Sequence, residues 1–212
     1  MRVLIAVLAS AVSVSLAALF ASTATADAPT LDRNSSVKYA VAVYHLPNGT
    51  AVSAVALELI SRTSDSGERK QYFVGAGIET DCPMCGAPSF PLLQASDLFD
   101  SPQLHGGING AKLDVTLPVY YCVLDNCPAT IRVSLVWEPD GHPLRDTKST
   151  RTDTASCRFT KVTHWAITTA TATGFISDGT NNLASGETSG DMSEGSTRIV
   201  GFGDPAVCLS PP

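Results

Sequence analysis

Six cysteines are the residues of this 212-residue chain whose type and spacing suggest a chemistry. They form two close pairs, Cys82 with Cys85 and Cys122 with Cys127, and two single residues, Cys157 and Cys208. Four thiolates at C-x2-C and C-x4-C spacing suit a tetrahedral zinc ion. A redox C-x-x-C pair would need a helix N-terminus in a βαβ context to lower the thiol pKa, and the sequence offers none. Disulfide bonds are the third interpretation, and the cellular compartment decides among the three.

The N-terminal residues predict export. After a positively charged start, an uncharged apolar run extends from Val3 to Ala21, and Ala24-Thr25-Ala26 fits the small-x-small pattern that precedes cleavage. We therefore expect a secretory signal peptide over residues 1–26 and a mature start at Asp27. After cleavage, the protein is expected to be secreted and not attached to the membrane. An uncleaved anchor is the alternative, because about 20 apolar residues span a bilayer. Residues 27–212 suffice for a single domain with its own core.

An even number of cysteines in an exported chain favours disulfide bonds over metal or redox chemistry. The sequence leaves three alternatives open for the four cysteines of the two close pairs. They ligate zinc, they form a disulfide bond within each pair, or they form disulfide bonds from one pair to the other. Under each of these alternatives, Cys157 and Cys208 are the two cysteines that remain. We therefore predict a disulfide bond between Cys157 and Cys208.

The strands beside the second close pair restrict its geometry. If the apolar residues on both sides of this hairpin share one face, the numbers of paired residues must sum to an even value, as when Tyr121 lies opposite Cys127. A three-residue loop of residues 124–126, with Asn126 in the left-handed conformation, meets this parity. A direct bond from Cys122 to Cys127 then requires the strand ends to twist or bulge.

The charge balance argues against polyanionic partners. The chain has 14 Lys and Arg against 20 Asp and Glu, a formal net charge of −6. Such a chain repels nucleic acid and anionic membranes overall, and no cluster of Lys and Arg in the sequence offers a local exception. The sequence leaves the partner unidentified, and an extracellular protein or a glycan is compatible with this charge.

Alternation of apolar and polar residues predicts an all-β antiparallel fold. It is clearest from Leu113 to Tyr121 and from Ile131 to Trp137, where every second residue is apolar. Asn48-Gly49 predicts a type I′ turn between strands 37–46 and 51–61. Further strands are predicted at 71–79 and 197–202, and residues 157–177 are predicted to form one long strand or a bent pair of strands.

Two segments are predicted to be loops. One is rich in Cys, Pro and Gly near residues 80–110, and the other is polar and acidic near residues 178–196. Many strands without a substantial helix indicate a β-sandwich, with a β-barrel as the alternative, stapled by disulfide bonds.

The sequence contains no catalytic constellation. The histidines lie far apart and no H-E-x-x-H or G-x-S-x-G motif occurs. They are His45, His105, His142 and His164. A triad can still assemble in space from one of them, an acid and a serine. We assign no catalytic, cofactor-binding or metal-ligating residue and expect no cofactor.

Two further sets of side chains suggest binding. The first carries oxygen ligands suited to calcium but lacks the EF-hand order, and a solvated loop is the simpler interpretation; it comprises Asp178, Asn181, Asn182, Asp191 and Glu194. The second is aromatic, because Tyr120, Trp137 and Trp165 would stack sugars if they shared an exposed face. Strand parity places Trp137 in the core instead.

We therefore expect a secreted, disulfide-stapled β-domain that binds a partner or has a structural role, without catalysis. The alternative is a small secreted hydrolase acting on sugar or peptide, with its site in the two predicted loops. A pocket that joins a histidine, an acid and a serine within hydrogen-bond reach would favour the hydrolase. A third possibility is a carbohydrate-binding module, which requires coplanar exposed aromatic residues.

Overall fold

The computed structural model describes residues 30–63, 67–81, 89–154 and 157–203. The predicted signal peptide and mature start, together with Cys82, Cys85 and Cys208, lie outside the described residues. None of the described segments forms a helix of the length and apolarity that crossing a bilayer requires.

The described residues form ten antiparallel strands. They are β1 (Thr30–His45), β2 (Thr50–Thr63), β3 (Gly67–Asp81), β4 (Ser89–Phe99), β5 (His105–Gly107), β6 (Gly110–Cys122), β7 (Thr130–Pro139), β8 (Leu144–Asp153), β9 (Arg158–Ser177) and β10 (Asn182–Phe202). The predicted all-β, antiparallel, disulfide-stapled fold is confirmed.

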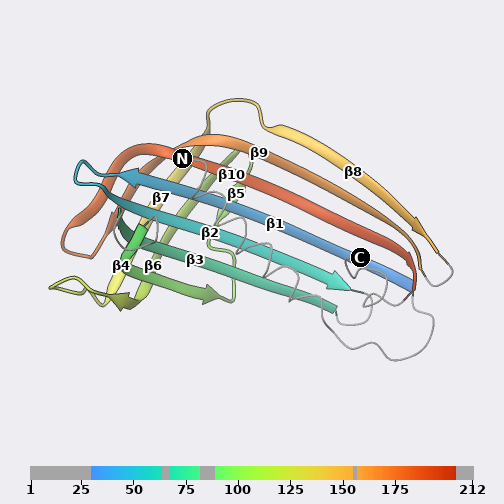
Figure 1. Cartoon of the computed structure of the whole chain (residues 1–212), viewed down its shortest axis with the longest axis horizontal. Coiled ribbons are helices and arrows are strands. Elements are labelled where there is room, and N and C mark those ends of the chain that lie inside the picture. The colour runs from blue at the N-terminus through green and yellow to red at the C-terminus, as the bar shows by residue number, and fades with distance from the viewer. Residues whose placement is uncertain (1–29, 64–66, 82–88, 155–156, 204–212) are drawn as a thin grey trace.

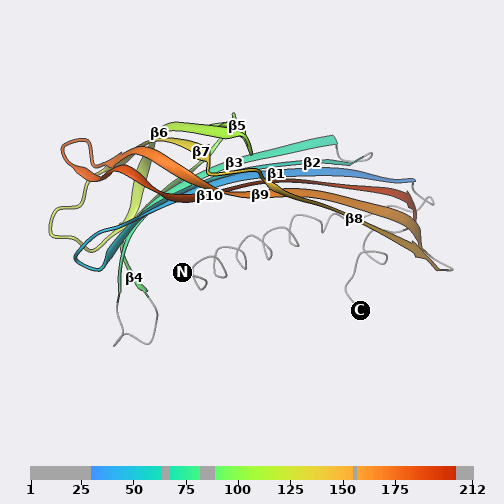
Figure 2. The ribbon, with the colours of Figure 1, turned by 90° about the horizontal axis from the view of Figure 1, so that it is seen from above.

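All ten strands belong to one sheet that forms a ring. The order is β10-β1-β2-β3-β4-β6-β7-β9, and β9 pairs back to β10. β4, β6 and β7 cross one end of the molecule, whereas the long strands continue past them (Figure 1). The turned view shows the long strands leaving the ring as a single layer (Figure 2).

We call this single layer the projecting sheet. It comprises six strand segments in the order β8-β9-β10-β1-β2-β3. Their residue ranges are 144–153, 158–167, 193–202, 30–39, 57–63 and 67–72. β8 continues along the edge of β9 beyond β7, because Pro139 pairs with Ala170 and Leu144 with Ile167.

Strand alternation gives the projecting sheet an inner and an outer face. Ala40, Met192 and Thr168 are cross-strand neighbours in the ring interior, so even-numbered residues of β1, β9 and β10 face inward. Odd-numbered residues of the same strands face outward, and this parity continues into the projecting sheet.

The ring interior is filled with apolar side chains. Trp137 is fully buried, and its Nε1–H donates a hydrogen bond of 2.8 Å to the Val41 carbonyl of β1. The predicted alternation in β6 and β7 is confirmed, because Leu113 and Leu117 pack on Leu135 and its inward neighbours.

The first hairpin pairs as predicted but its turn is of another type. Leu46 N–H bonds to the Thr50 carbonyl and Gly49 N–H to the Leu46 carbonyl. Gly49 has φ of 77°, and no described residue other than glycine has positive φ. Asn48 therefore excludes the predicted type I′ turn, and the geometry is a type I turn followed by a left-handed glycine.

Both predicted loops are wrong, because they contain strands. Residues near 80–110 include β4, which pairs with β3 and β6. Residues near 178–196 lie mostly in β10, which is hydrogen-bonded to β1 on one side and β9 on the other. Residues 182–196 of β10 lack an apolar alternation, so the sequence pattern does not predict them as a strand.

Candidate binding face

One disulfide bond among the close pairs is local. Cys122 and Cys127 form a disulfide bond with each other, so neither sulfur is left to ligate zinc or to form a cross-link to the other pair. The predicted register of the hairpin is correct, since Pro118 pairs with Thr130. The strands separate there, so the predicted three-residue loop with a left-handed Asn126 is wrong and residues 123–129 form a wider loop that accommodates the bond.

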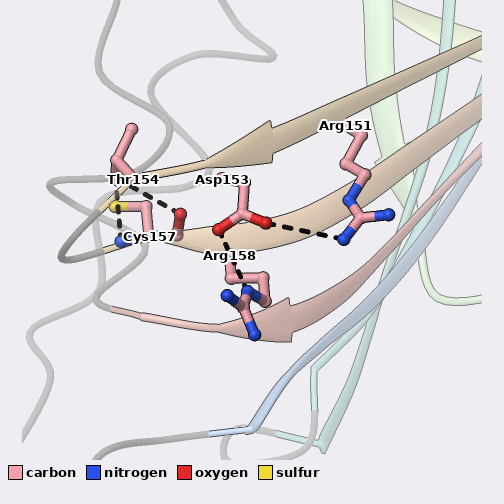
Figure 3. Close-up of polar contacts among 5 residues, drawn as sticks. All are labelled: Arg151, Asp153, Thr154, Cys157 and Arg158. Carbon is pink, nitrogen blue, oxygen red and sulfur yellow. Dashed lines mark hydrogen bonds and ion pairs between the residues drawn. The ribbon is translucent and has the colours of Figure 1, made fainter.

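Cys157 is also disulfide-bonded, and its partner lies outside the described residues. It is buried against Phe159 and Ile199 at the far end of the projecting sheet. Thr154 fixes the chain beside it, because Cys157 N–H bonds to Thr154 Oγ1 at 3.0 Å (Figure 3). Asp153 lies between the guanidinium groups of Arg151 and Arg158 on the same hairpin.

We expect peptide mapping without reductant to recover Cys157 linked to Cys208. The described geometry leaves Cys82, Cys85 and Cys208 as possible partners, and Cys82 and Cys85 can bond to each other. In the chain-entropy model, a closed ring of about 50 residues stabilises the fold by roughly 4 kcal/mol. Replacing both Cys157 and Cys208 by serine should lower the melting temperature. A peptide that links Cys157 to Cys82 or Cys85 would contradict the pairing.

The inner face of the projecting sheet carries a polar groove of about 330 Å³. His164 lies in it, with Ser196 as its cross-strand neighbour and Thr147 on its other side. His164 Nδ1 is 2.9 Å from Thr147 Oγ1, and no hydrogen bond joins His164 to an acid among the described residues. Glu194 in the same groove accepts from the Ile108 N–H instead. The groove therefore contains the residue types of a triad without its hydrogen bonds.

The other three histidines and the proposed oxygen ligands do not assemble into a site. His45, His105 and His142 are exposed on separate turns or strands. Asp178 accepts hydrogen bonds from the backbone N–H groups of Asn181 and Thr180, which lower the pKa of its carboxyl group. No three His, Cys, Asp or Glu side chains gather into a metal site in the part of the chain that the structure describes.

Asp191 and Glu194, both from the proposed calcium set, lie on opposite faces of β10. Burial raises the pKa of Asp191, and the nearby Asp140 raises it further. Burial, followed by the charge of Asp191, also raises the pKa of Tyr39. Asp191 and Asp140 lie on the side of the outer face that is nearer the ring.

The aromatic residues do not share one platform. Trp137 is inside the ring, and Tyr120 is exposed on β6, where its hydroxyl donates to Gln94 Oε1. Of these three residues, Trp165 lies on the outer face of the projecting sheet, with 40% of its surface exposed. The parity-based placement of Trp137 in the core is confirmed.

Trp165 borders an outer groove of about 270 Å³ that crosses the strands. An apolar row forms one wall, in the order Trp165, Gly195, Val37 and Leu59. A hydroxyl row forms the other, in the order Thr163, Thr197, Ser35 and Ser61. Gly195 contributes no side chain to this row, and a Cβ atom there would lie within 4 Å of both Val37 and Trp165.

The charges of the molecule are segregated. The projecting sheet carries eleven of the 14 Lys and Arg but only six of the 20 Asp and Glu, a formal charge of +5 within a chain of −6. Sequence reasoning missed this because the cations come from six separate strand segments that only the pairing register brings together.

Comparisons with known proteins give no family. No family model and no curated protein matches the chain. A solved structure of the enduracididine biosynthesis enzyme MppR, in complex with the condensation product of pyruvate and imidazole 4-carboxaldehyde, is 14% identical and covers 83% of this chain and 89% of that chain. Its TM-score is 0.24.

Proposed function

We propose that this is a secreted binding protein without catalytic activity and that the outer face of the projecting sheet is its binding surface. The outer groove carries this proposal. Trp165 exposes a large indole beside the half-buried side chains of Val37 and Leu59, and a row of hydroxyl groups faces them. Concave sites with apolar walls and a few convergent polar groups are typical of ligand binding.

The inner groove supports the hydrolase alternative less well. A general base needs an orienting partner, and the hydrogen-bond partner of His164 is a threonine hydroxyl. Its groove is lined by charged side chains of an open sheet, which leaves the reacting groups in water. We therefore favour binding over hydrolysis.

Acrylamide quenching of tryptophan fluorescence tests the proposal. Trp137 is fully buried and Trp165 is exposed, so acrylamide should quench Trp165 selectively in the unmodified protein. A panel of neutral and acidic oligosaccharides, peptides and fatty acids should contain at least one class that protects Trp165 from quenching. The Trp165→Phe variant should lose both the quenchable emission and the affinity for that class.

Two results would contradict the proposal. One is a panel in which no class protects Trp165. The other is turnover of an ester, glycoside or peptide in the panel that the His164→Ala variant abolishes, which would establish the hydrolase.

A further inference from the structure

We infer that the ligand of the outer groove is an acidic glycan, a chain of sugar units carrying carboxylates, that lies across the strands. This inference rests on the proposed function and adds the ligand class to it. Three features of the outer face carry it: the arrangement of cations, the hydroxyl row and the indole.

Cations stand at both ends of the hydroxyl row. Lys148 of β8 pairs with Thr163 at one end, and Arg69 of β3 pairs with Ser61 at the other. Lys148 and Arg69 lie on the first and the last of six neighbouring strands. Five inter-strand spacings of the usual 4.7–4.9 Å place them about 24 Å apart. The ladder thus presents one hydroxyl per strand between two cationic ends.

The next row of the outer face adds two more cations. Lys161 and Arg33 flank Ile199 there, since both pair with it across the sheet. The outer face of the projecting sheet therefore has four cations and one acid, Asp146 beside Trp165. Lys148, Lys161 and Arg69 make no ion pair with any described residue.

The inner face differs in this respect. It has seven cations and five acids, a smaller excess of positive charge than on the outer face. Four of these cations form ion pairs within the protein: Lys38 with Glu58, Lys70 with Glu68, and Arg151 and Arg158 with Asp153. The outer cations instead add up to a local positive potential on a protein of negative net charge.

The walls of the groove favour a glycan over other polyanions. Sugar rings have an apolar face that can lie on the indole of Trp165 and equatorial hydroxyls that can bond to the Ser and Thr row. Thr163 and Thr197 already approach each other, with their Oγ1 atoms 3.3 Å apart, and keep further hydrogen-bonding capacity for a ligand. Carboxylates on the sugar would pair with Lys148 and Arg69 at the two ends.

Acids on the ring side limit where the ligand can lie. Asp191 and Asp140 are beyond the apolar row, on the side opposite to the cations. An acidic chain is therefore attracted to the hydroxyl row and repelled from the ring. This arrangement orients the glycan across the strands and not along them.

Two charge-matched double variants test the inference. The double variant Lys148→Glu with Arg69→Glu reverses the charge at both ends of the hydroxyl row on the outer face. Arg145→Glu with Lys70→Glu makes the same change of charge on the inner face of the same two strands, and all four side chains are exposed. Binding of an oligogalacturonate is measured by titration at NaCl concentrations of about 0.01 M and 0.1 M, between which the Debye length falls from about 30 Å to about 10 Å.

We expect the outer variant to bind at least tenfold more weakly, the inner variant to bind within threefold of the unmodified protein, and the affinity to fall with salt. Equal losses in both variants would overturn the inference, because the attraction would then be unspecific. Thermal unfolding of both variants shows whether a loss of binding comes from loss of the fold.

Other ligands distinguish this inference from the proposed function. Equally tight binding of the methyl-esterified oligosaccharide, independent of salt, would overturn the acidic class while leaving a binding protein. Tighter binding of a single-stranded DNA oligonucleotide or of phosphatidylglycerol vesicles would likewise replace the glycan by another polyanion. If none of these probes binds but another class protects Trp165, the inference fails and the proposed function stands.

Discussion

Replacing Trp137 by alanine is expected to lower the free energy of unfolding by about 3–5 kcal/mol, the usual cost of removing a large buried aromatic side chain. Trp137 is the largest fully buried side chain described, and it fills the ring between β7 and β1. The cavity left behind cannot close easily, because the surrounding strands are fixed to one another around the ring. Chemical denaturation at equilibrium measures the change.

The matched control is Trp137→Phe. It retains most of the apolar volume and loses the hydrogen bond to the Val41 carbonyl, and its cost should be smaller, about 1–3 kcal/mol, the penalty for an unsatisfied buried group. Equal stability of the alanine variant and the unmodified protein would show that the ring interior is not packed around this residue.

Gly190 of β10 lies beside the contact between the Trp137 indole and the Val41 carbonyl of β1. A Cβ atom at this position would collide with the Val41 carbonyl oxygen and approach the Trp137 indole to 3.1 Å. The glycine lets the indole reach the backbone of β1. The sequence places Gly190 in a predicted polar loop, and only the pairing of β10 with its two neighbours reveals this role.

The sequence predicts those strands whose own side chains alternate. In β6 and β7 the burial of every second residue follows the predicted pattern, because each strand has one face in the ring. β8 and residues 182–196 of β10 are not predicted as strands, whereas the end of β10, residues 197–202, is. Every residue of β8 except Thr152 is exposed, and residues 182–196 are rich in Gly, Ser and Thr, so neither segment shows an apolar period.

The candidate site was less predictable than the fold, because its residues come together only through strand pairing. Lys148, Arg69 and Arg33 are separated by long stretches of sequence, and their common face depends on the register of five strand pairs. Net charge suggested repulsion of anions, whereas the local distribution of charge favours their binding. Trp165 could be recognised as a candidate from its type alone, but its exposure follows from the outward parity of β9.

Deleting Ser189 and Gly190 from β10 is expected to abolish the cooperative unfolding transition. These residues pair with Val43 and Ala42 on β1 and with Thr171 and Ala170 on β9. Removing two residues preserves the inner and outer parity but shifts one half of β10 by two positions against both neighbours. The shifted half of β10 must then either break its hydrogen bonds to both neighbours or place Met192 and Ile199 at the wrong positions. Either change costs more than the free energy of unfolding of a typical domain, which is about 5–15 kcal/mol.

Deleting Gly141 and His142 provides a control of equal length. Both are exposed, and they lie where the chain between β7 and β8 has four residues opposite two of β9. Their removal should let β7 and β8 continue along β9 without interruption, with a change in stability within about 1 kcal/mol. Far-UV circular dichroism and thermal melting compare the two deletions. A normal melting transition for the β10 deletion would mean that residues 182–202 do not form the strand that joins β1 to β9.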